Sequence, residues 1–582
     1  MGDGLGSVHG RRRLAGRTRY YVAAGAAATL GIGLALGTTA QGANALPNTV
    51  NSVPSPAATP ASSWQVVVPA TPIKHLVVIF DENESFDHYF GTYPYATNTD
   101  GSYFHAAAGT PTPAGLYSKI NKPSKKKVGG PVGQLLTNNP NSYNPERLSS
   151  SEALTCDQNH DYGPEQQAFD NGKMDQFVED TGSDATCAAG TSDEYASAGL
   201  VMDYYDGNTV TGLWNYAQNF AMSDNDYDTN FGPSTPGALN LISGDDGGGY
   251  AVSPTTGAVT AAPGSVSALN SSGLGTIYGD LDPAFDDCSD SSHTSTDPVG
   301  VMTGKNIGEM LDAAHVSWGW FQGGFAPTGT NSAGYAVCGT EHTNIGGEEV
   351  QDYVPHHDPF QFYRATANPK HLPPTSEAAI GHTDQANHQY DLSLFDETLK
   401  DGNMPAVSFL KPPAYENGHP GYSDPLDEQK FLANTIDEIE ASPDWDSTAI
   451  IITYDDSDGW YDHMAPTIVS GSHSAQDGSA CTTAPDVLGG YPDRCGYGPR
   501  LPLIVISPYT QQNYISANLT DTSSIIAFIE DNWLTGSRIG DGSFDAIAGS
   551  LYAKGGVLDL VDPPHFAPVF IDPTTGEVQS KP

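Results

Sequence analysis

Two apolar runs of strand length constrain the fold of this chain more than any other feature. One covers residues 73–80 and leads directly into Asp81, Glu82 and Asn83, and the other covers residues 448–454 and leads into Asp455 and Asp456. Continuous β-branched runs of this kind predict strands that are buried on both faces, as in parallel sheets. Because ligands of open α/β sheets bind beyond the carboxyl ends of the strands, the two runs would bring oxygen ligands for a divalent cation to one edge. The alternative is that these acidic residues are ordinary helix caps or turn formers.

Further patterns extend this prediction to a large α/β fold. Apolar runs at 316–321, 406–410 and 501–506 predict more buried strands, and helical patterns cover 213–220, 391–400, 427–441 and 522–533. Strands that alternate with helices indicate a mainly parallel central sheet flanked by helices. We expect one domain over residues 73–563 with long loop insertions, of which the Gly- and Ser-rich stretches 244–275 and 286–300 are examples. A proline-rich, extended tail is expected over 564–582.

The charge balance of the chain limits its partners. Among 582 residues, 24 Lys and Arg face 69 Asp and Glu, which gives a formal charge of -45. Such a surface repels nucleic acid and anionic membranes, so a nucleic-acid partner is not expected. The simplest explanation of the large negative charge is that it keeps the protein soluble.

The first 45 residues have the pattern of a signal peptide. Arginines at positions 11–19 precede an apolar segment at 21–36, and Ala43-Asn44-Ala45 fits a small-x-small cleavage site. Residues 46–72, rich in Pro, Ala, Ser and Thr, are expected to form a linker. We therefore expect a secreted, extracellular protein without a transmembrane segment after cleavage; an uncleaved anchor is the alternative.

The chain has six cysteines, which fits the expected extracellular location. An even number in an exported chain predicts disulfides, for which fifteen pairings of six cysteines are possible. Pairing of sequence neighbours is the simplest: Cys156–Cys187, Cys288–Cys338 and Cys481–Cys495.

A Gly-Pro-Ser-Thr-Pro-Gly segment at 232–237 predicts a helix start that carries a hydroxyl group. With Pro236 as first helical residue, Ser234 or Thr235 would lie at the helix N-terminus, where backbone N–H groups favour phosphate. An ordinary helix cap is the commoner use of such a residue. No Gly-x-Ser-x-Gly motif surrounds it, so activation of a serine by a metal fits better than a Ser-His-Asp triad.

Histidines in Gly-, Pro- and Asp-rich loops are candidates for the remaining roles. These are His160, His356, His357, His419 and His463. Loops commonly carry binding and catalytic residues, although a single loop histidine is more often plain surface.

Five segments together resemble a known family. Residues 82–91 (Glu-Asn-Glu-Ser-Phe-Asp-His-Tyr-Phe-Gly), 232–244, 353–363, 418–425 and 455–463 are similar, in the same order, to blocks of the bacterial phosphoesterase family that contains secreted acid phosphatases and phospholipases C. The similarity extends over roughly residues 73–540. Five ordered blocks are far more specific than any one motif.

The resemblance implies an alkaline-phosphatase-like α/β fold in which 73–563 is the catalytic domain. It implies a divalent metal held by Glu82, Asn83, Asp455 and Asp456, with Ser234 as nucleophile. It also implies that His160, one or both of His356 and His357, and His419 contact the phosphate or the leaving group. Carboxylate and amide ligands suit Mg²⁺, Ca²⁺ or Mn²⁺, and the nearby histidines leave Zn²⁺ and Fe open.

These observations predict a secreted, metal-dependent hydrolase of phosphoric esters that works through a phosphoserine. Ser234 and the following Gly-Ala-Leu-Asn run resemble the acid phosphatase branch, because the phospholipase branch more often has threonine there, followed by Pro-Asn-Arg. The substrate would be a small phosphate ester or, in the alternative, a phospholipid head group cleaved by phospholipase C activity. A second alternative is an exported binding protein on the same fold without catalysis.

Overall fold

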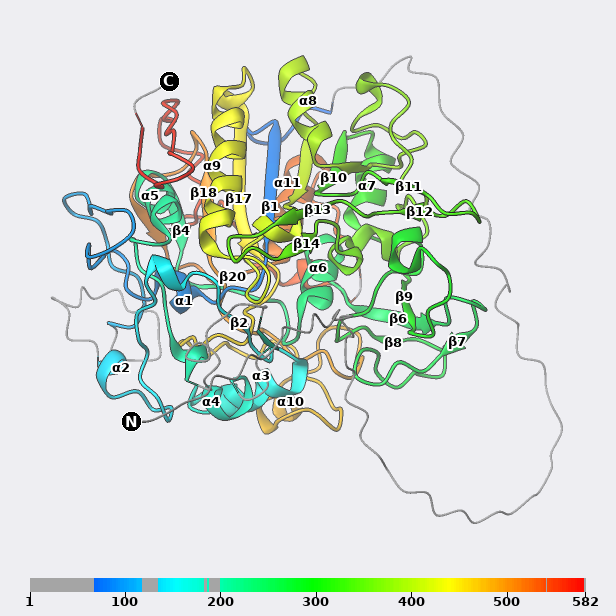
Figure 1. Cartoon of the computed structure of the whole chain (residues 1–582), viewed down its shortest axis with the longest axis horizontal. Coiled ribbons are helices and arrows are strands. Elements are labelled where there is room, and N and C mark those ends of the chain that lie inside the picture. Colours follow the sequence, from blue (N-terminus) through cyan, green and yellow to red (C-terminus); the bar gives the residue numbers. More distant parts are fainter. Residues whose placement is uncertain (1–66, 118–133, 183–185, 188–198, 541, 580–582) are drawn as a thin grey trace, which may run out of the picture. The chain divides into compact units, whose positions relative to one another are not determined.

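An eight-stranded mixed sheet forms the centre of the computed structural model (Figure 1). The structure describes residues 67–579 apart from 118–133, 183–185, 188–198 and 541, and apart from the side chains of 186 and 187. In spatial order the strands are β15 (Gln389–Asp391), β10 (Trp318–Gln322), β16 (Val407–Lys411), β1 (His75–Asp81), β17 (Thr448–Tyr454), β18 (Leu503–Ile506), β4 (Ala221–Ser223) and β19 (Tyr514–Ser516).

The sheet is mainly parallel, as the sequence predicts. β1 pairs in parallel with β16 on one side and with β17 on the other, and β18 is antiparallel to both of its neighbours. The β1–β17 register aligns His75 with Thr448 and Asp81 with Tyr454, so both strands end at the same edge. In Figure 1 the blue β1 and the yellow β17 accordingly run side by side.

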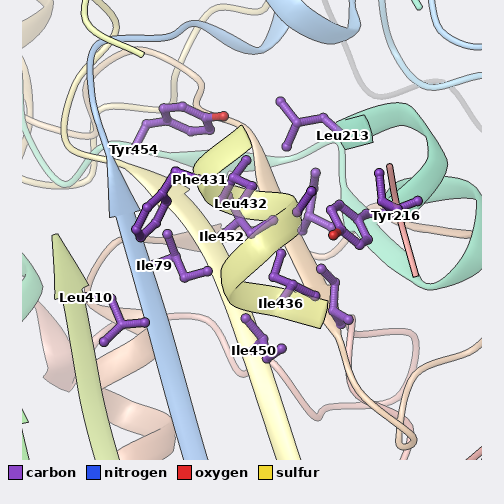
Figure 2. Packing of buried hydrophobic residues seen from close by; sticks show 14 of the residues in the cluster. Ile79, Leu213, Tyr216, Leu410, Phe431, Leu432, Ile436, Ile450, Ile452 and Tyr454 are labelled. Atoms are coloured by element: carbon purple, nitrogen blue, oxygen red, sulfur yellow. The ribbon is translucent and has the colours of Figure 1, made fainter. Parts of the chain in front are cut away.

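Both faces of the sheet are covered, which explains the unbroken apolar runs. Side chains alternate along a strand, so Val77 and Ile79 of β1 enter one core while Leu76, Val78 and Phe80 enter the other. The first core includes residues of α5 (Thr211–Asn219), α8 (Ser393–Asp401) and α9 (Pro425–Ala441). Figure 2 shows Phe431, Leu432 and Ile436 of α9 packed over Ile450 and Ile452 of β17. The second core includes residues of α6 (Ser234–Ser243), α7 (Ile307–Ala314) and α11 (Ser524–Trp533).

The predicted strands and helices are confirmed with small shifts of their ends. The remaining helices are α1 (Phe86–Phe90), α2 (Gln134–Thr137), α3 (Tyr162–Phe169), α4 (Phe177–Asp180) and α10 (Ser479–Thr483). Short strand pairs are β2 (Cys156–Asp157) with β3 (Thr186–Cys187), β5 (Asp226–Tyr227) with β20 (Thr520–Asp521), β11 (Gly329–Thr330) with β12 (Ala336–Val337), and β13 (Glu341–Thr343) with β14 (Glu349–Gln351).

The Gly- and Ser-rich stretches are not purely surface insertions, contrary to the expectation from composition. β6 (Gly247–Val252) lies within a second sheet, between β8 (Gly275–Thr276) and β7 (Val259–Thr260), and it also pairs with β9 (Val299–Met302). Gly249 has no room for a side chain, because a Cβ there would press on Ile277 and Met302. Close approach of neighbouring segments, rather than exposure, explains Gly249.

Two of the three expected disulfides are present, Cys288–Cys338 and Cys481–Cys495, with Cα–Cα distances of 5.7 and 5.6 Å. For the third, the Cys187 side chain lies outside the described residues, but the backbone pairs Cys156 with Cys187 across β2 and β3. The predicted signal peptide and most of the linker, residues 46–66, also lie outside them.

The C-terminal segment is packed rather than free. Phe570 and Ile571 are buried, the Ile571 N–H donates to Asp437 of α9, and Asn215 of α5 donates to the carbonyl of Gly576. Among the described residues, no helix has the length and apolar character needed to cross a membrane.

Candidate active site

The site begins where β1 and β17 end. Because their register aligns Asp81 with Tyr454, Glu82 and Asp455 follow at adjacent positions of the same edge. The Asn83 N–H donates to Asp455 Oδ1 at 2.9 Å, and the Asp456 N–H donates to the same oxygen at 2.9 Å. Asn83 has a φ of 61°, a left-handed conformation that asparagine tolerates better than most residues. The chain turns sharply there and keeps both strand ends together.

Helix α6 brings Ser234 to this edge. The helix begins at Ser234 itself, so Pro236 is its third residue rather than its first. Ser234 Oγ lies 3.1 Å from Asp456 Oδ2, 3.4 Å from Glu82 Oε2 and 3.4 Å from the side-chain oxygen of Asn83. Gly237 permits this approach, because a Cβ at that position would overlap the carbonyl oxygen of Asp455.

Oxygen atoms converge around Ser234 in an arrangement that fits a cation. The side-chain oxygen of Asn83 points at Glu82 Oε2, 2.9 Å away, and at Asp455 Oδ1, 3.2 Å away, both of which are acceptors. Acceptors that face each other repel unless the amide turns over or a positive ion lies among them. Asp455 Oδ2 is buried and accepts no hydrogen bond from the described residues. Carboxylate and amide oxygens are the ligands of hard divalent cations.

The electrostatics of the carboxylates also favour a bound cation. Burial and the neighbouring Glu82 raise the pKa of Asp455 to about 6, and burial raises the pKa of Asp456 well above its usual value. Carboxylates that are crowded together in a buried place tend to take up protons, unless a positive charge nearby compensates their negative charges. A divalent cation would supply that charge and keep the carboxylates ionised.

Lys411 is a further member of the site. It is the last residue of β16, which pairs with β1, and its ammonium group forms an ion pair with Glu82 Oε1. The same group lies 3.8 Å from Asp455 Oδ2, and the side chain is only 1% exposed. It partly compensates the acidic cluster from the neighbouring strand.

The adjacent histidines His356 and His357 have opposite protonation preferences. Burial lowers the pKa of His356, but the carboxylates of Asp280 and Asp282 outweigh this and raise it to about 9. Burial, the charge of His356 and that of Lys411 lower the pKa of His357 well below its usual value. His357 Nδ1 lies 2.9 Å from Glu82 Oε1, a contact that a neutral imidazole N–H can make as well as a charged one. Near neutral pH these shifts in pKa favour a charged His356 beside a neutral His357.

His160 and His419 lie together near Asn83. His160 Nε2 is 3.4 Å and His419 Nε2 is 3.2 Å from atoms of the Asn83 amide, and the two rings are 6.3 Å apart. Burial lowers the pKa of His160, but Asp456, Asp157 and Asp458 outweigh it and raise the pKa well above its usual value. His419 is stacked on Tyr422 with ring centres 4.1 Å apart, which fixes its orientation.

Two acids, the buried Glu165 and the more exposed Asp280, hold the segment around Ser234 in place. Glu165 accepts a hydrogen bond from the Gly232 N–H at 2.9 Å and another from Ser457 Oγ at 2.8 Å. Asp280 accepts hydrogen bonds from the N–H and the hydroxyl of Thr235, each at 3.0 Å. The hydroxyl of Thr235 is thereby engaged, which leaves Ser234 as the hydroxyl that faces the oxygen cluster.

The structure thus brings together nine of the ten candidate residues named from the sequence: Glu82, Asn83, His160, Ser234, His356, His357, His419, Asp455 and Asp456. His463 lies in a different network, where it binds Asp87, which also pairs with Arg500. Sequence reasoning missed Lys411, Asp280 and Glu165. Lys411 could have been found, because it directly follows the predicted strand 406–410, just as Asp81 and Asp455 follow theirs.

Comparison with known proteins finds similarity over most of the chain. A model of the Phosphoesterase family matches residues 73–535. The non-hemolytic phospholipase C of Pseudomonas aeruginosa is 23% identical over 472 residues, which are 79% of this chain and 54% of that protein. The non-hemolytic phospholipase C of Burkholderia pseudomallei is 23% identical over 466 residues, 79% of this chain and 55% of that protein. Phospholipase C A of Mycobacterium tuberculosis is 23% identical over 477 residues, 79% of this chain and 72% of that protein.

The chain spans about half the length of the Pseudomonas and Burkholderia relatives. The family match nevertheless covers most of the chain and includes all five sequence segments described above. This chain therefore belongs to the Phosphoesterase family.

Proposed function

We propose that this protein is a secreted, metal-dependent hydrolase of phosphoric esters that acts through a phosphoserine at Ser234. The observation that carries the proposal is the position of Ser234 Oγ, within 3.4 Å of oxygen atoms from both strand ends. A serine hydroxyl needs a base or a positive charge beside it to become a nucleophile. This position gives it a carboxylate acceptor and places it at a candidate cation site.

Glu82, Asn83, Asp455 and Asp456 would hold the cation, and Ser234 Oγ lies within their reach. When bound, a divalent ion supplies positive charge that lowers the pKa of the serine hydroxyl and offsets the charge of the phosphoryl group. The composition of the ligand set, oxygen atoms with histidines nearby, leaves the choice among Mg²⁺, Ca²⁺, Mn²⁺, Zn²⁺ and Fe to measurement.

The residues of the chain account for both proton movements. Ser234 Oγ attacks phosphorus while Asp456 Oδ2, 3.1 Å away, accepts its proton, and the bond from phosphorus to the ester oxygen breaks. Protonated His160 donates a proton to the leaving oxygen, with His419 as the other donor within the same group. Charged His356 binds phosphoryl oxygen. In the second half-reaction, water attacks the phosphoserine and gives a proton to the now neutral His160. The bond from phosphorus to Ser234 Oγ breaks, phosphate leaves, and Asp456 returns its proton to Ser234 Oγ.

The proposed enzyme has an alkaline-phosphatase-like fold. A mainly parallel sheet that carries a phosphate site at its carboxyl edge fits an alkaline-phosphatase-like architecture, with a catalytic domain over 73–563. Export through the N-terminal signal sequence would place the enzyme outside the cell.

Trapping the intermediate tests the mechanism. The protein is mixed with an aryl phosphate, quenched in acid and digested, and the peptide that contains residue 234 is analysed by mass spectrometry. We expect phosphate on Ser234, no phosphate on that peptide in Ser234→Ala, and a loss of kcat on the order of a thousandfold or more. Ser234→Thr keeps a hydroxyl and should retain measurable turnover. Normal turnover by Ser234→Ala would rule out the covalent scheme.

The class of ester separates two candidate functions. Ser234 and the following Gly-Ala-Leu-Asn run favour a phosphomonoester, as in acid phosphatases, while the names of the relatives favour phospholipase C activity on a phosphodiester. Release of phosphate from an aryl phosphate and release of phosphocholine from phosphatidylcholine, measured on one preparation, distinguish them. A preparation inactive on both esters with every divalent metal would instead favour a non-catalytic binding protein.

A further inference from the structure

A cavity of about 1000 Å³, away from the candidate active site, lies beside the four-stranded sheet that contains β6. None of the proposed catalytic or metal-binding residues lines it. One wall is apolar and consists of Val252 from β6, Val299 from β9, Phe285 and Ala367, all of which belong to one small buried cluster. A cavity of this size with apolar walls is typical of sites for small organic molecules.

Arg364 at this cavity differs from every other arginine that the structure describes. Arg147, Arg494, Arg500 and Arg538 each form an ion pair with at least one carboxylate. Arg364 forms none with the described residues; its guanidinium lies over the ring of Phe285, 4.6 Å from the ring centre, and the side chain is exposed. Lys370, also exposed at the cavity, likewise has no acidic partner there. Two basic side chains at one cavity that form no ion pair with the described residues are unusual in a chain with 24 basic and 69 acidic residues.

The acidic residues at the cavity already have partners. Asp286 accepts hydrogen bonds from His371 Nε2 at 2.7 Å and from the Tyr353 hydroxyl at 2.5 Å. Asp287 accepts from the Ala336 N–H, and Asp290 from the Ser295 N–H. These hydrogen bonds engage the three carboxylates with protein groups, whereas Arg364 and Lys370 form no ion pair with the described residues.

A second aromatic surface lines the cavity. The rings of His293 and Tyr335 are stacked with centres 3.5 Å apart, and both residues line the cavity. The segments that carry them are joined by the Cys288–Cys338 disulfide. The aromatic wall is therefore preformed, which lowers the entropic cost of binding a flat molecule.

We propose that this cavity binds an organic anion, whose apolar and planar body packs on Phe285 and the His293–Tyr335 pair while its charged group contacts Arg364. Guanidinium groups bind carboxylate, sulfonate and phosphate oxygens through two N–H groups and also stack on flat rings. The site is separate from the proposed phosphoesterase centre and does not depend on it.

Anilinonaphthalene sulfonate, an aromatic anion, is a suitable probe, and its fluorescence reports binding. We expect saturable binding to the folded protein and at least about tenfold weaker affinity in Arg364→Gln, because one charge-assisted contact is lost. Ala365→Trp, which places a large ring at the exposed edge of the cavity, should weaken binding as well. Thioflavin T, an aromatic cation, should bind much more weakly than the anion.

Lys400→Gln is the matched control, since it removes one positive charge from an exposed position outside the cavity. It should leave the affinity unchanged, and Arg364→Gln should keep the unfolding temperature and the hydrolysis rate of the wild type. Equal affinity of Arg364→Gln and wild type for the anion would overturn the proposal, as would equal binding of the cationic dye.

Discussion

The ammonium group of Lys411 forms an ion pair with the carboxylate of Glu82 and joins the ends of β16 and β1. Both side chains are almost completely buried, at 1% and 0% exposure. A buried charge is tolerated only with a partner, so this pair makes the fold and the proposed metal site depend on each other.

Lys411→Met tests the dependence directly. In metal-free protein the substitution leaves Glu82 without its cation, and we expect a loss of about 3 kcal/mol in the free energy of unfolding. With saturating metal the loss should be clearly smaller, because the bound ion takes over the compensation. Denaturant unfolding of both forms measures this, with Lys400→Met, an exposed lysine, as control. Identical losses in both forms would contradict the coupling.

Removal of the metal should lower both activity and stability. A ligand present at 100 times its Kd stabilises a protein by about 2.7 kcal/mol, so dialysis against a chelator should lower the unfolding temperature of the wild type by several degrees. The double substitution Asp455→Asn with Asp456→Asn should bind little metal and should not respond to the chelator.

Without metal, this double variant should be at least as stable as the wild type. It removes two buried carboxylates whose pKa values are raised by burial. Elemental analysis and thermal unfolding give both quantities, and Asp562→Asn, on the exposed surface, serves as control. A full complement of metal in the double variant would exclude the proposed ligands.

Gly237→Ala should separate Ser234 from the strand ends. A Cβ at residue 237 would overlap the carbonyl oxygen of Asp455, and backbone cannot move aside as a flexible side chain can. We expect a destabilisation of about 1–3 kcal/mol, as for other overpacked sites, and a much larger proportional fall in kcat. Gly329→Ala is the control, because a Cβ there meets nothing within 4 Å. An unchanged kcat would mean that the position of α6 does not govern the chemistry.

His356 should set an upper pH limit for activity. The acidic neighbours Asp280 and Asp282 raise its pKa to about 9, so the ring is positive below that pH and loses its charge above it. If the charge binds phosphoryl oxygen, kcat/KM for an aryl phosphate should fall as the pH rises through about 9. His356→Gln should lower kcat/KM at neutral pH by at least about tenfold and should lack this limb.

The exposed His105 supplies the control for the pH experiment, and His105→Gln should reproduce the wild-type profile. A basic limb that persists unchanged in His356→Gln would assign the titration to another group.

Much of the architecture could be predicted from local patterns. The runs 73–80 and 448–454 are apolar without alternation because each strand is covered on both faces, and this is visible in the residues themselves. The same reasoning was incomplete for β6, whose glycines suggest a loop by composition, because Gly249 in fact permits close packing against Ile277 and Met302. Those neighbours are distant in sequence, and no local pattern reveals them.

The sequence by itself determined the buried strands, a helix start close to Ser234 and the polar residues that follow each strand, because these depend on short-range periodicity and turn chemistry. It did not fix the first helical residue, which is Ser234 and not Pro236. Only the tertiary structure decided which of these groups share a charge environment: that Lys411 compensates Glu82, that Thr235 is engaged by Asp280, and that His356 and His357 differ in pKa. Coulomb interactions and burial act through space over a few ångströms, so their outcome depends on side-chain positions that strand register and helix packing fix together.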